Sequence, residues 1–163
     1  MKIISISFKS KPDNYGIVDK NITRSAQPEV KNLVWLKNQG VTDIINFRTM
    51  YDKGITYDEK VEIAKLGMRY HQIPSYSRHP DENKINTFLK LVESIKEQNG
   101  RIHMHCKAGA DRTGMYAFIY KTINKLGTIE ENIIEWIKMG HNIKIYPELI
   151  GKTIKLLQKN KQI

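Results

Sequence analysis

The feature that most constrains this chain is a short apolar stretch that leads into a loop and then into a helix. The stretch Ile102–His105 is typical of a buried strand, and residues 115–126 are typical of a helix. Between them lies the string HCKAGADRTG at residues 105–114. Such a loop can wrap backbone N–H groups around one tetrahedral anion, because the first N–H groups of a helix have no intrahelical partner. The sequence therefore predicts an anion-binding loop.

Four side chains of this loop suit phosphoryl transfer. Cys106 is the predicted nucleophile, since the field that holds a phosphate also favours a thiolate. Arg112 offers a planar fork for two phosphate oxygens, and Thr113 can donate its hydroxyl to the cysteine sulfur. Gly109 permits a positive φ and a close approach to a ligand. Together they predict catalysis through a cysteinyl-phosphate.

The string from Cys106 to Gly114 resembles the C-x5-R signature of the cysteine-dependent phosphatases, which include protein tyrosine, dual-specificity and phosphoinositide phosphatases. The match is specific because His-Cys, the five-residue spacing and the trailing Arg-Thr-Gly occur together. The resemblance implies a phosphatase that needs neither metal nor cofactor. It also implies that the loop binds substrate through His105, Lys107, Ala108, Gly109 and Ala110, with His105 orienting the loop from beneath.

Two further features bear on the substrate. The string Arg24–Pro28, RSAQP, resembles a segment of the atypical dual-specificity phosphatases, including a plant and fungal group that acts on inositol pyrophosphates. Lys107 resembles the lysine of phosphatase-and-tensin-type loops, where it helps to hold further phosphates of an inositol ring. Inositol phosphates or phosphoinositides are therefore the expected substrates. An anionic Asp111 would oppose a dense polyanion, so phosphotyrosine proteins remain the alternative.

The general acid departs from the family pattern. Aligning Pro80 and Ile85 with the family pattern places Tyr76 where relatives carry an aspartate on a loop. Asp111 resembles an aspartate that has an acid or base role in lipid-directed bacterial phosphatases and myotubularins, and Asp81 is the other candidate. Asp111 is preferred because its place in the loop guarantees proximity. The alternatives are a helix N-terminal role for Asp81 and a structural carboxylate, paired with Arg112 or a backbone N–H, for Asp111.

Composition sets wider limits. The 163 residues fit one phosphatase domain, residues 1–163, and the net charge of +10 with a pI near 9.6 predicts an anionic partner. A phosphorylated substrate satisfies this, and peripheral contact with an anionic membrane is compatible with it. A non-catalytic phosphate-binding or nucleic-acid-binding module is the alternative of another class, although no recognised nucleic-acid motif is present and no specific nucleic acid is expected. We expect a monomer.

The single cysteine predicts a reducing compartment, because the expected nucleophile must remain a free thiol. The N-terminal apolar run is too short for a signal peptide, and no later stretch is long enough to span a membrane. A cytoplasmic protein is expected, and delivery to a host cell stays open.

Strand patterns that alternate with helix patterns predict an α/β fold with a central, mostly parallel sheet flanked by helices, as in dual-specificity phosphatases. Arg48 is expected either to pair with a carboxylate such as Glu62 or to be a solvated cation. His103 and His105 share a strand face, but no carboxylate near in sequence completes a metal site. The expected strands are 3–7, 17–25, 41–47, 68–74 and 102–105, and the expected helices are 28–39, 57–66, 84–98, 115–126, one from Thr128, and 147–159.

Overall fold

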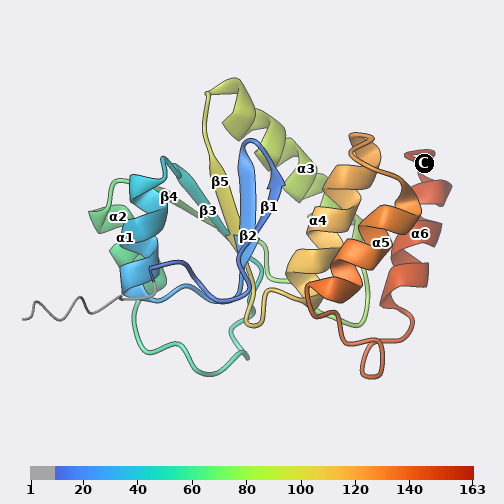
Figure 1. Cartoon of the computed structure of the whole chain (residues 1–163), viewed down its shortest axis with the longest axis horizontal. Helices are drawn as coiled ribbons and strands as arrows, with labels where there is room; N and C mark the ends of the chain where they lie inside the picture. The colour runs from blue at the N-terminus through green and yellow to red at the C-terminus, as the bar shows by residue number, and fades with distance from the viewer. Residues whose placement is uncertain (1–9) are drawn as a thin grey trace, which may run out of the picture.

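A five-stranded sheet lies at the centre of the fold in the computed structural model, which describes residues 10–163 (Figure 1). The strand order is β1-β2-β5-β3-β4, and only the β1–β2 pair is antiparallel. The predicted mostly parallel sheet is thus confirmed. The strands are β1 (Gly16–Asp19), β2 (Ile22–Ser25), β3 (Asp43–Asn46), β4 (Arg69–Gln72) and β5 (Ile102–His105).

The first described strands differ from the prediction of one strand over residues 17–25. Two residues, Lys20 and Asn21, separate β1 from β2 as a turn. The Asp19 carboxylate accepts a 2.7 Å hydrogen bond from the Asn21 N–H, a local pairing that competes with a continuous strand. The strand predicted at residues 3–7 lies outside the described residues.

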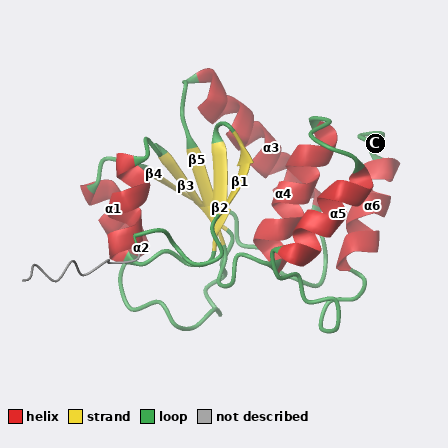
Figure 2. Ribbon diagram, viewed as in Figure 1, coloured by secondary structure: helices red, strands yellow, loops and turns green. Residues whose placement is uncertain are grey.

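Helices cover both faces of the sheet, with α1 and α2 on one face and α3 to α6 on the other (Figure 2). The predicted helix start at Thr128 is confirmed, because its side chain accepts the N–H three residues later. Asp58 caps α2 in the same way, within the helix predicted over 57–66. The helix predicted over 115–126 instead begins inside the loop, at Asp111. The helices are α1 (Val30–Asn38), α2 (Glu59–Lys65), α3 (Glu82–Glu97), α4 (Asp111–Ile123), α5 (Ile129–Lys138) and α6 (Leu149–Lys159).

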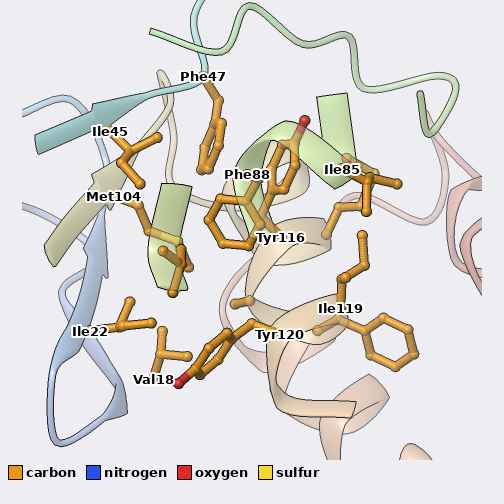
Figure 3. Close-up of a cluster of buried hydrophobic side chains, with 14 of the residues drawn as sticks. Val18, Ile22, Ile45, Phe47, Ile85, Phe88, Met104, Tyr116, Ile119 and Tyr120 are labelled. Carbon is orange, nitrogen blue, oxygen red and sulfur yellow. The ribbon is translucent and has the colours of Figure 1, made fainter. Parts of the chain in front are cut away.

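Each face of the sheet has its own hydrophobic core. The larger one lies between the sheet and the α3 to α6 side, where Phe47 stacks on Tyr116 with ring centroids 4.0 Å apart (Figure 3). The Tyr116 hydroxyl lies 2.7 Å from the Ser75 hydroxyl, so α4 also fixes the segment that follows β4. The smaller core lies under α1 and α2 and comprises Leu33, Leu36, Val41, Ile44, Ile63 and Met68.

The parallel strands end at one edge of the sheet. Ser25 and Asn46 both pair with His105, and Asn46 also pairs with Gln72, so the last residues of β2, β5, β3 and β4 are in register. The loops that follow these four strands therefore converge at this edge, where ligands bind in open α/β sheets. In Figure 1 they form the lower side of the molecule, together with the loop that joins α5 to α6.

Candidate active site

The loop after β5 has the form that an anion-binding site requires. Cys106 directly follows the strand and is only 2% exposed. Gly109 has a φ of +69°, and α4 begins two residues later. The N–H groups of residues 107–110 donate no hydrogen bond to any group of residues 10–163. Those donors and the first turn of α4 are therefore available to one anion.

The RSAQP segment holds this loop from the side of β2. A Cβ atom on Gly109 would lie 2.4 Å from the backbone of both Ser25 and Ala26, so only glycine fits there. Arg24 donates a 2.6 Å hydrogen bond to the Gly109 carbonyl, and the Gln27 N–H donates to the Lys107 carbonyl at 3.0 Å. The segment singled out in the sequence thus has a clear structural task, which is to fix the shape of the loop.

Two guanidinium groups lie near the Cys106 sulfur. Burial lowers the pKa of Arg24 to about 10, and the charges of Glu135 and Cys106 oppose this effect. Although burial also acts against the Arg112 charge, the hydrogen bonds to Asp52 and the charge of Cys106 raise the pKa of that guanidinium above its ordinary value. Both arginines therefore stay protonated near neutral pH. They therefore bring two positive charges to the loop that carries Cys106.

Asp52 is a member of the site that sequence reasoning missed. Its carboxylate accepts hydrogen bonds from Arg112 Nη1 at 2.8 Å and from Nη2 at 2.9 Å. The Thr49 N–H and hydroxyl donate to the same carboxylate. The Arg112 bonds, against the effect of burial, hold the pKa of Asp52 well below its usual range. The available signal was its place in the loop after β3, beside the strand that carries Cys106.

A cavity of about 690 Å³ opens at this edge, with Arg112 in its wall, while Cys106 and residues 107–111 lie outside its lining. Lys84 Nζ lies 5.4 Å from the ring centroid of Tyr76, and the Arg78 guanidinium lies 6.0 Å from that of Tyr146. The cavity therefore combines cations with aromatic rings, a lining that suits a phosphorylated ligand. The residues that line it are Thr49, Tyr51, Asp52, Ser75, Tyr76, Ser77, Arg78, His79, Pro80, Asp81, Lys84, Arg112, Met115, Tyr116 and Tyr146.

Two predicted substrate-binding residues, His105 and Lys107, differ in their burial. His105 is fully buried, its Nδ1 is 3.2 Å from the Cys106 carbonyl, and its Nε2 is 2.7 Å from the Glu59 carboxylate. His105 thus lies beneath the loop and braces it, as the sequence predicted, and the buried imidazole supports the substrate site without facing it. Lys107 is exposed and does not line the cavity. Besides Arg112, the cations that line it are Arg78, from the segment after β4, and Lys84, from α3.

Asp111 has the structural partners that the sequence offered as its alternative role. One carboxylate oxygen lies 2.7 Å from His141 Nδ1 and accepts the Asn142 N–H at 2.9 Å. His141 packs against Trp136 with ring centroids 4.8 Å apart, and Trp136 Nε1 donates to the Ala110 carbonyl at 3.1 Å. Asp111 thus ties the start of α4 to the loop that joins α5 to α6. It does not line the cavity.

The other loop residues differ in exposure. Ala108 is exposed and Ala110 is 6% exposed, so any part that they play in binding falls to their backbone N–H groups. The Thr113 hydroxyl is fully buried and makes no hydrogen bond to residues 10–163. The predicted bond from Thr113 to the Cys106 sulfur is therefore not formed in this structure.

The position usually taken by the acid carries Tyr76, whose side chain is 56% exposed. Ser75 is buried against Tyr116, and neither Ser75 nor Ser77 offers a carboxylate. Asp81 lies further along the same segment, accepts the Lys84 N–H at 3.1 Å as the N-cap of α3, and lines the cavity. Asp81 therefore has the helix-capping role predicted as its alternative, and it also faces the site.

Both expectations for Arg48 are wrong, because it is 2% exposed and bonds to other partners than Glu62. It donates to the Gln27 amide oxygen at 3.0 Å and to the Lys53 carbonyl at 2.7 Å. The buried His103 uses both ring nitrogens, at 2.8 Å from the Thr23 hydroxyl and 2.7 Å from that of Ser25. In residues 10–163, no three His, Cys, Asp or Glu side chains are arranged to hold a metal ion.

Comparison with known proteins agrees with this geometry. A model of the Tc-R-P family, described as the DSP-PTPase phosphatase of polymorphic toxin systems, matches residues 18–122. The chain belongs to this family. This family is one of dual-specificity and tyrosine-phosphatase-type phosphatases, which agrees with the resemblance of the string from Cys106 to Gly114 to the cysteine-dependent phosphatases.

Two curated relatives are similar in sequence. The dual specificity protein phosphatase TpbA of Pseudomonas aeruginosa is 25% identical over 112 residues, which are 66% of this chain and 48% of TpbA. The Dictyostelium discoideum protein DG1060, named a probable tyrosine-protein phosphatase, is 29% identical over 107 residues, 63% of this chain and 62% of its own length. This chain thus spans about half the length of TpbA.

Solved structures share the fold. A DUF442 protein of Shewanella putrefaciens superposes with a TM-score of 0.78 at 21% identity and covers 98% of both chains. TpbA superposes with a TM-score of 0.72 at 19% identity, and the match covers 88% of this chain and 84% of the TpbA chain. The catalytic domain of Siw14 from S. cerevisiae superposes with a TM-score of 0.69 at 17% identity, and the match covers 94% of this chain and 96% of that domain.

Among residues 10–163, every helix is too short or too polar to cross a bilayer.

Proposed function

We propose that this phosphatase removes phosphate from inositol phosphates or phosphoinositides through a cysteinyl-phosphate intermediate. The observation that carries the proposal is the loop after Cys106, whose N–H groups are available to an anion, whose Gly109 carbonyl is held by Arg24, and which leads into α4 and Arg112. No metal is needed on this route, because the loop and Arg112 neutralise the phosphate charge.

In the first step, the loop N–H groups and Arg112 hold three phosphate oxygens. The Cys106 sulfur attacks phosphorus in line with the leaving oxygen, so an S–P bond forms as the P–O bond breaks. The leaving oxygen takes a proton from a general acid. In the second step, water attacks phosphorus, its proton passes to the same group, and the S–P bond breaks to restore the Cys106 thiolate.

Asp81 is the carboxylate that we favour as this acid, in place of Asp111. Asp81 lines the cavity, whereas an oxygen of Asp111 is occupied by His141 and Asn142. Proton transfer requires hydrogen-bond reach to the leaving oxygen, so geometry comes before charge in this choice. Asp52 also lines the cavity, but Arg112 keeps it ionised.

Charge supports the inositol substrate. Arg78 and Lys84 line the cavity beside Arg112, and the whole chain carries a net charge of +10. Phosphates next to the one being removed would meet these cations. Siw14, which has the same fold, is named a PP-IP phosphatase. Lys107 is exposed and lies beside Cys106, so we expect it to contact further phosphates from the loop itself.

Phosphotyrosine is the second candidate substrate, and the aromatic lining of the cavity favours it. Tyr51, Tyr76 and Tyr146 line the cavity, and the first two are 74% and 56% exposed. Such rings can pack against the phenyl group of a phosphotyrosine. TpbA, a relative in sequence and fold, has been solved with phosphotyrosine bound.

Phosphate release in the presence of a chelator tests the proposal. Inositol polyphosphates, phosphoinositides and phosphotyrosine peptides are compared at equal ionic strength, with Cys106→Ser as the blank. We expect the inositol substrates to give the highest kcat/KM and the serine variant to release none. Faster release from peptides would reverse the order of the two substrates. Binding without release by the unaltered protein would support a non-catalytic phosphate-binding module instead.

A further inference from the structure

A second cavity, of about 330 Å³, lies beside the catalytic one and shares three of its residues. Arg78, His79 and Tyr146 line both cavities, so the two spaces adjoin each other. The remaining wall of the second cavity comes from the loop that joins α5 to α6 and from the start of α6. Lys144 and Lys152 belong to this wall.

The charges of this second cavity are mainly positive. Arg78, Lys144 and Lys152 line it together with one carboxylate, that of Glu148, which lies 2.6 Å from Lys152. Lys152 is the main cause of the lowered pKa of Glu148, and His79 is among the smaller causes. Lys144 has no ion-pair partner among residues 10–163. Positive charge therefore predominates around the Glu148 carboxylate.

Arg78 connects the two spaces. Its guanidinium lies 6.0 Å from the ring centroid of Tyr146, and both residues belong to the shared wall. An anion in the second cavity would therefore lie next to a ligand whose reacting phosphate is held by Arg112. Lys107, the lysine that the sequence suggested for extra phosphates, lines neither cavity.

We infer that this second cavity is an accessory anion subsite that binds a phosphate other than the one being removed. The inference rests on the proposed function and narrows its substrate class to molecules with at least two phosphate groups. A monophosphate would fill the catalytic cavity alone. A polyphosphate would gain contacts with Lys144 and Lys152 that depend on its second phosphate.

The test compares two substrates in variants that touch only the second cavity. For a Lys144→Gln/Lys152→Gln variant, we expect kcat/KM for myo-inositol hexakisphosphate to fall about tenfold, the size that the loss of two partly exposed cations gives. With para-nitrophenyl phosphate, kcat/KM should change less than twofold. Glu148→Gln should raise the hexakisphosphate value about threefold, since it removes the opposing charge.

The matched control is the double variant Lys90→Gln/Lys138→Gln, which removes the same total charge as Lys144→Gln/Lys152→Gln. Lys90 is an exposed α3 residue that lines neither cavity. An equal loss in this control, or an equal loss with both substrates, would overturn the subsite in favour of a general surface field. A bisphosphorylated phosphoinositide in phosphatidylcholine vesicles, run beside the free inositol phosphate, separates a lipid headgroup from a soluble ligand.

Binding to Cys106→Ser by calorimetry separates failure of the subsite from failure of the proposed function. If hexakisphosphate is not hydrolysed but binds, and binding weakens in the double lysine variant, the subsite stands and the proposed substrate falls. If it is hydrolysed at the same rate with and without the lysines, the substrate stands and the subsite falls.

Discussion

Asp52 and Arg112 form an end-on bidentate ion pair in which both terminal nitrogens of the guanidinium donate to the carboxylate, at 2.8 and 2.9 Å. The pair is largely buried, with 13% and 11% of the two side chains exposed. This end-on contact leaves the Nε–H and the outer hydrogen of Nη2 free to face a phosphate. Asp52 therefore fixes the plane of Arg112 and does not compete for the donors that hold substrate.

Replacing Asp52 with asparagine should lower kcat/KM for an aryl phosphate about tenfold, because Arg112 loses its fixed plane and phosphate binds in more than one geometry. The pH at which the rate is highest should not move if Asp52 only positions Arg112. Steady-state kinetics over pH 4 to 8 check this. Asp58→Asn is the control, since asparagine also caps a helix. A higher kcat/KM in Asp52→Asn would mean that the carboxylate obstructs the site.

Gly109→Ala should abolish activity and lower the free energy of unfolding by about 2 kcal/mol or more, because the new Cβ would meet the Ser25 and Ala26 backbone at a φ of +69°. Gly151→Ala is the control, and its expected change in stability has the opposite sign. Nothing lies within 4 Å of a Cβ there, inside α6, so stability should rise by up to about 1 kcal/mol at unchanged activity. Urea unfolding and phosphate release measure both. A fully active Gly109→Ala variant would contradict the close packing of the RSAQP segment on the loop.

Short-range features of this chain were predictable, and long-range pairings were not. The strand, loop and helix around Cys106, the capping box of Thr128 and Glu131, and the parallel sheet follow from local patterns and hydrophobic periodicity. The Asp52–Arg112 pair joins residues 60 positions apart, and the Asp111–His141 contact spans 30. Which side chains meet across such distances depends on the packing of whole elements. For the same reason neither alternative for Arg48, a carboxylate partner such as Glu62 or solvent, anticipates the place beside Gln27 that the fold gives it.

The Asp43 cluster should make stability depend on pH. Asp43 is fully buried, and burial opposes its charge, but hydrogen bonds from His71, Arg69 and Thr42 outweigh this and lower its pKa in the folded state. A carboxyl whose pKa is lowered by folding stabilises the protein above its unfolded pKa, about 4, and loses that contribution as the pH falls toward the folded value. The Tm difference between the unaltered protein and Asp43→Asn should thus be largest near pH 6 and should shrink below pH 4.

Glu93→Gln is the reference for this measurement, because Glu93 is exposed on α3 and no ion pair holds it among residues 10–163. Its Tm should follow that of the unaltered protein at every pH. A Tm difference for Asp43→Asn that stays constant from pH 6 to pH 3 would mean that packing around the side chain, and not its charge, supplies the stability.

Substitution of Asp81 and substitution of Asp111 should change the pH profile of kcat in different ways. If Asp81 delivers the proton, Asp81→Asn should lower kcat for an alkyl phosphate about a hundredfold and remove the limb of the profile on which the acid must be protonated. The loss should be much smaller for para-nitrophenyl phosphate, whose leaving oxygen hardly needs a proton.

Asp111→Asn should keep the shape of the profile and reduce stability, because the contacts with His141 and Asn142 weaken. His141→Ala, which cuts the same contact from the other side, should reproduce the stability loss. If Asp111→Asn loses that limb while Asp81→Asn keeps it, the acid is in the nucleophile loop, and Asp81 only caps α3.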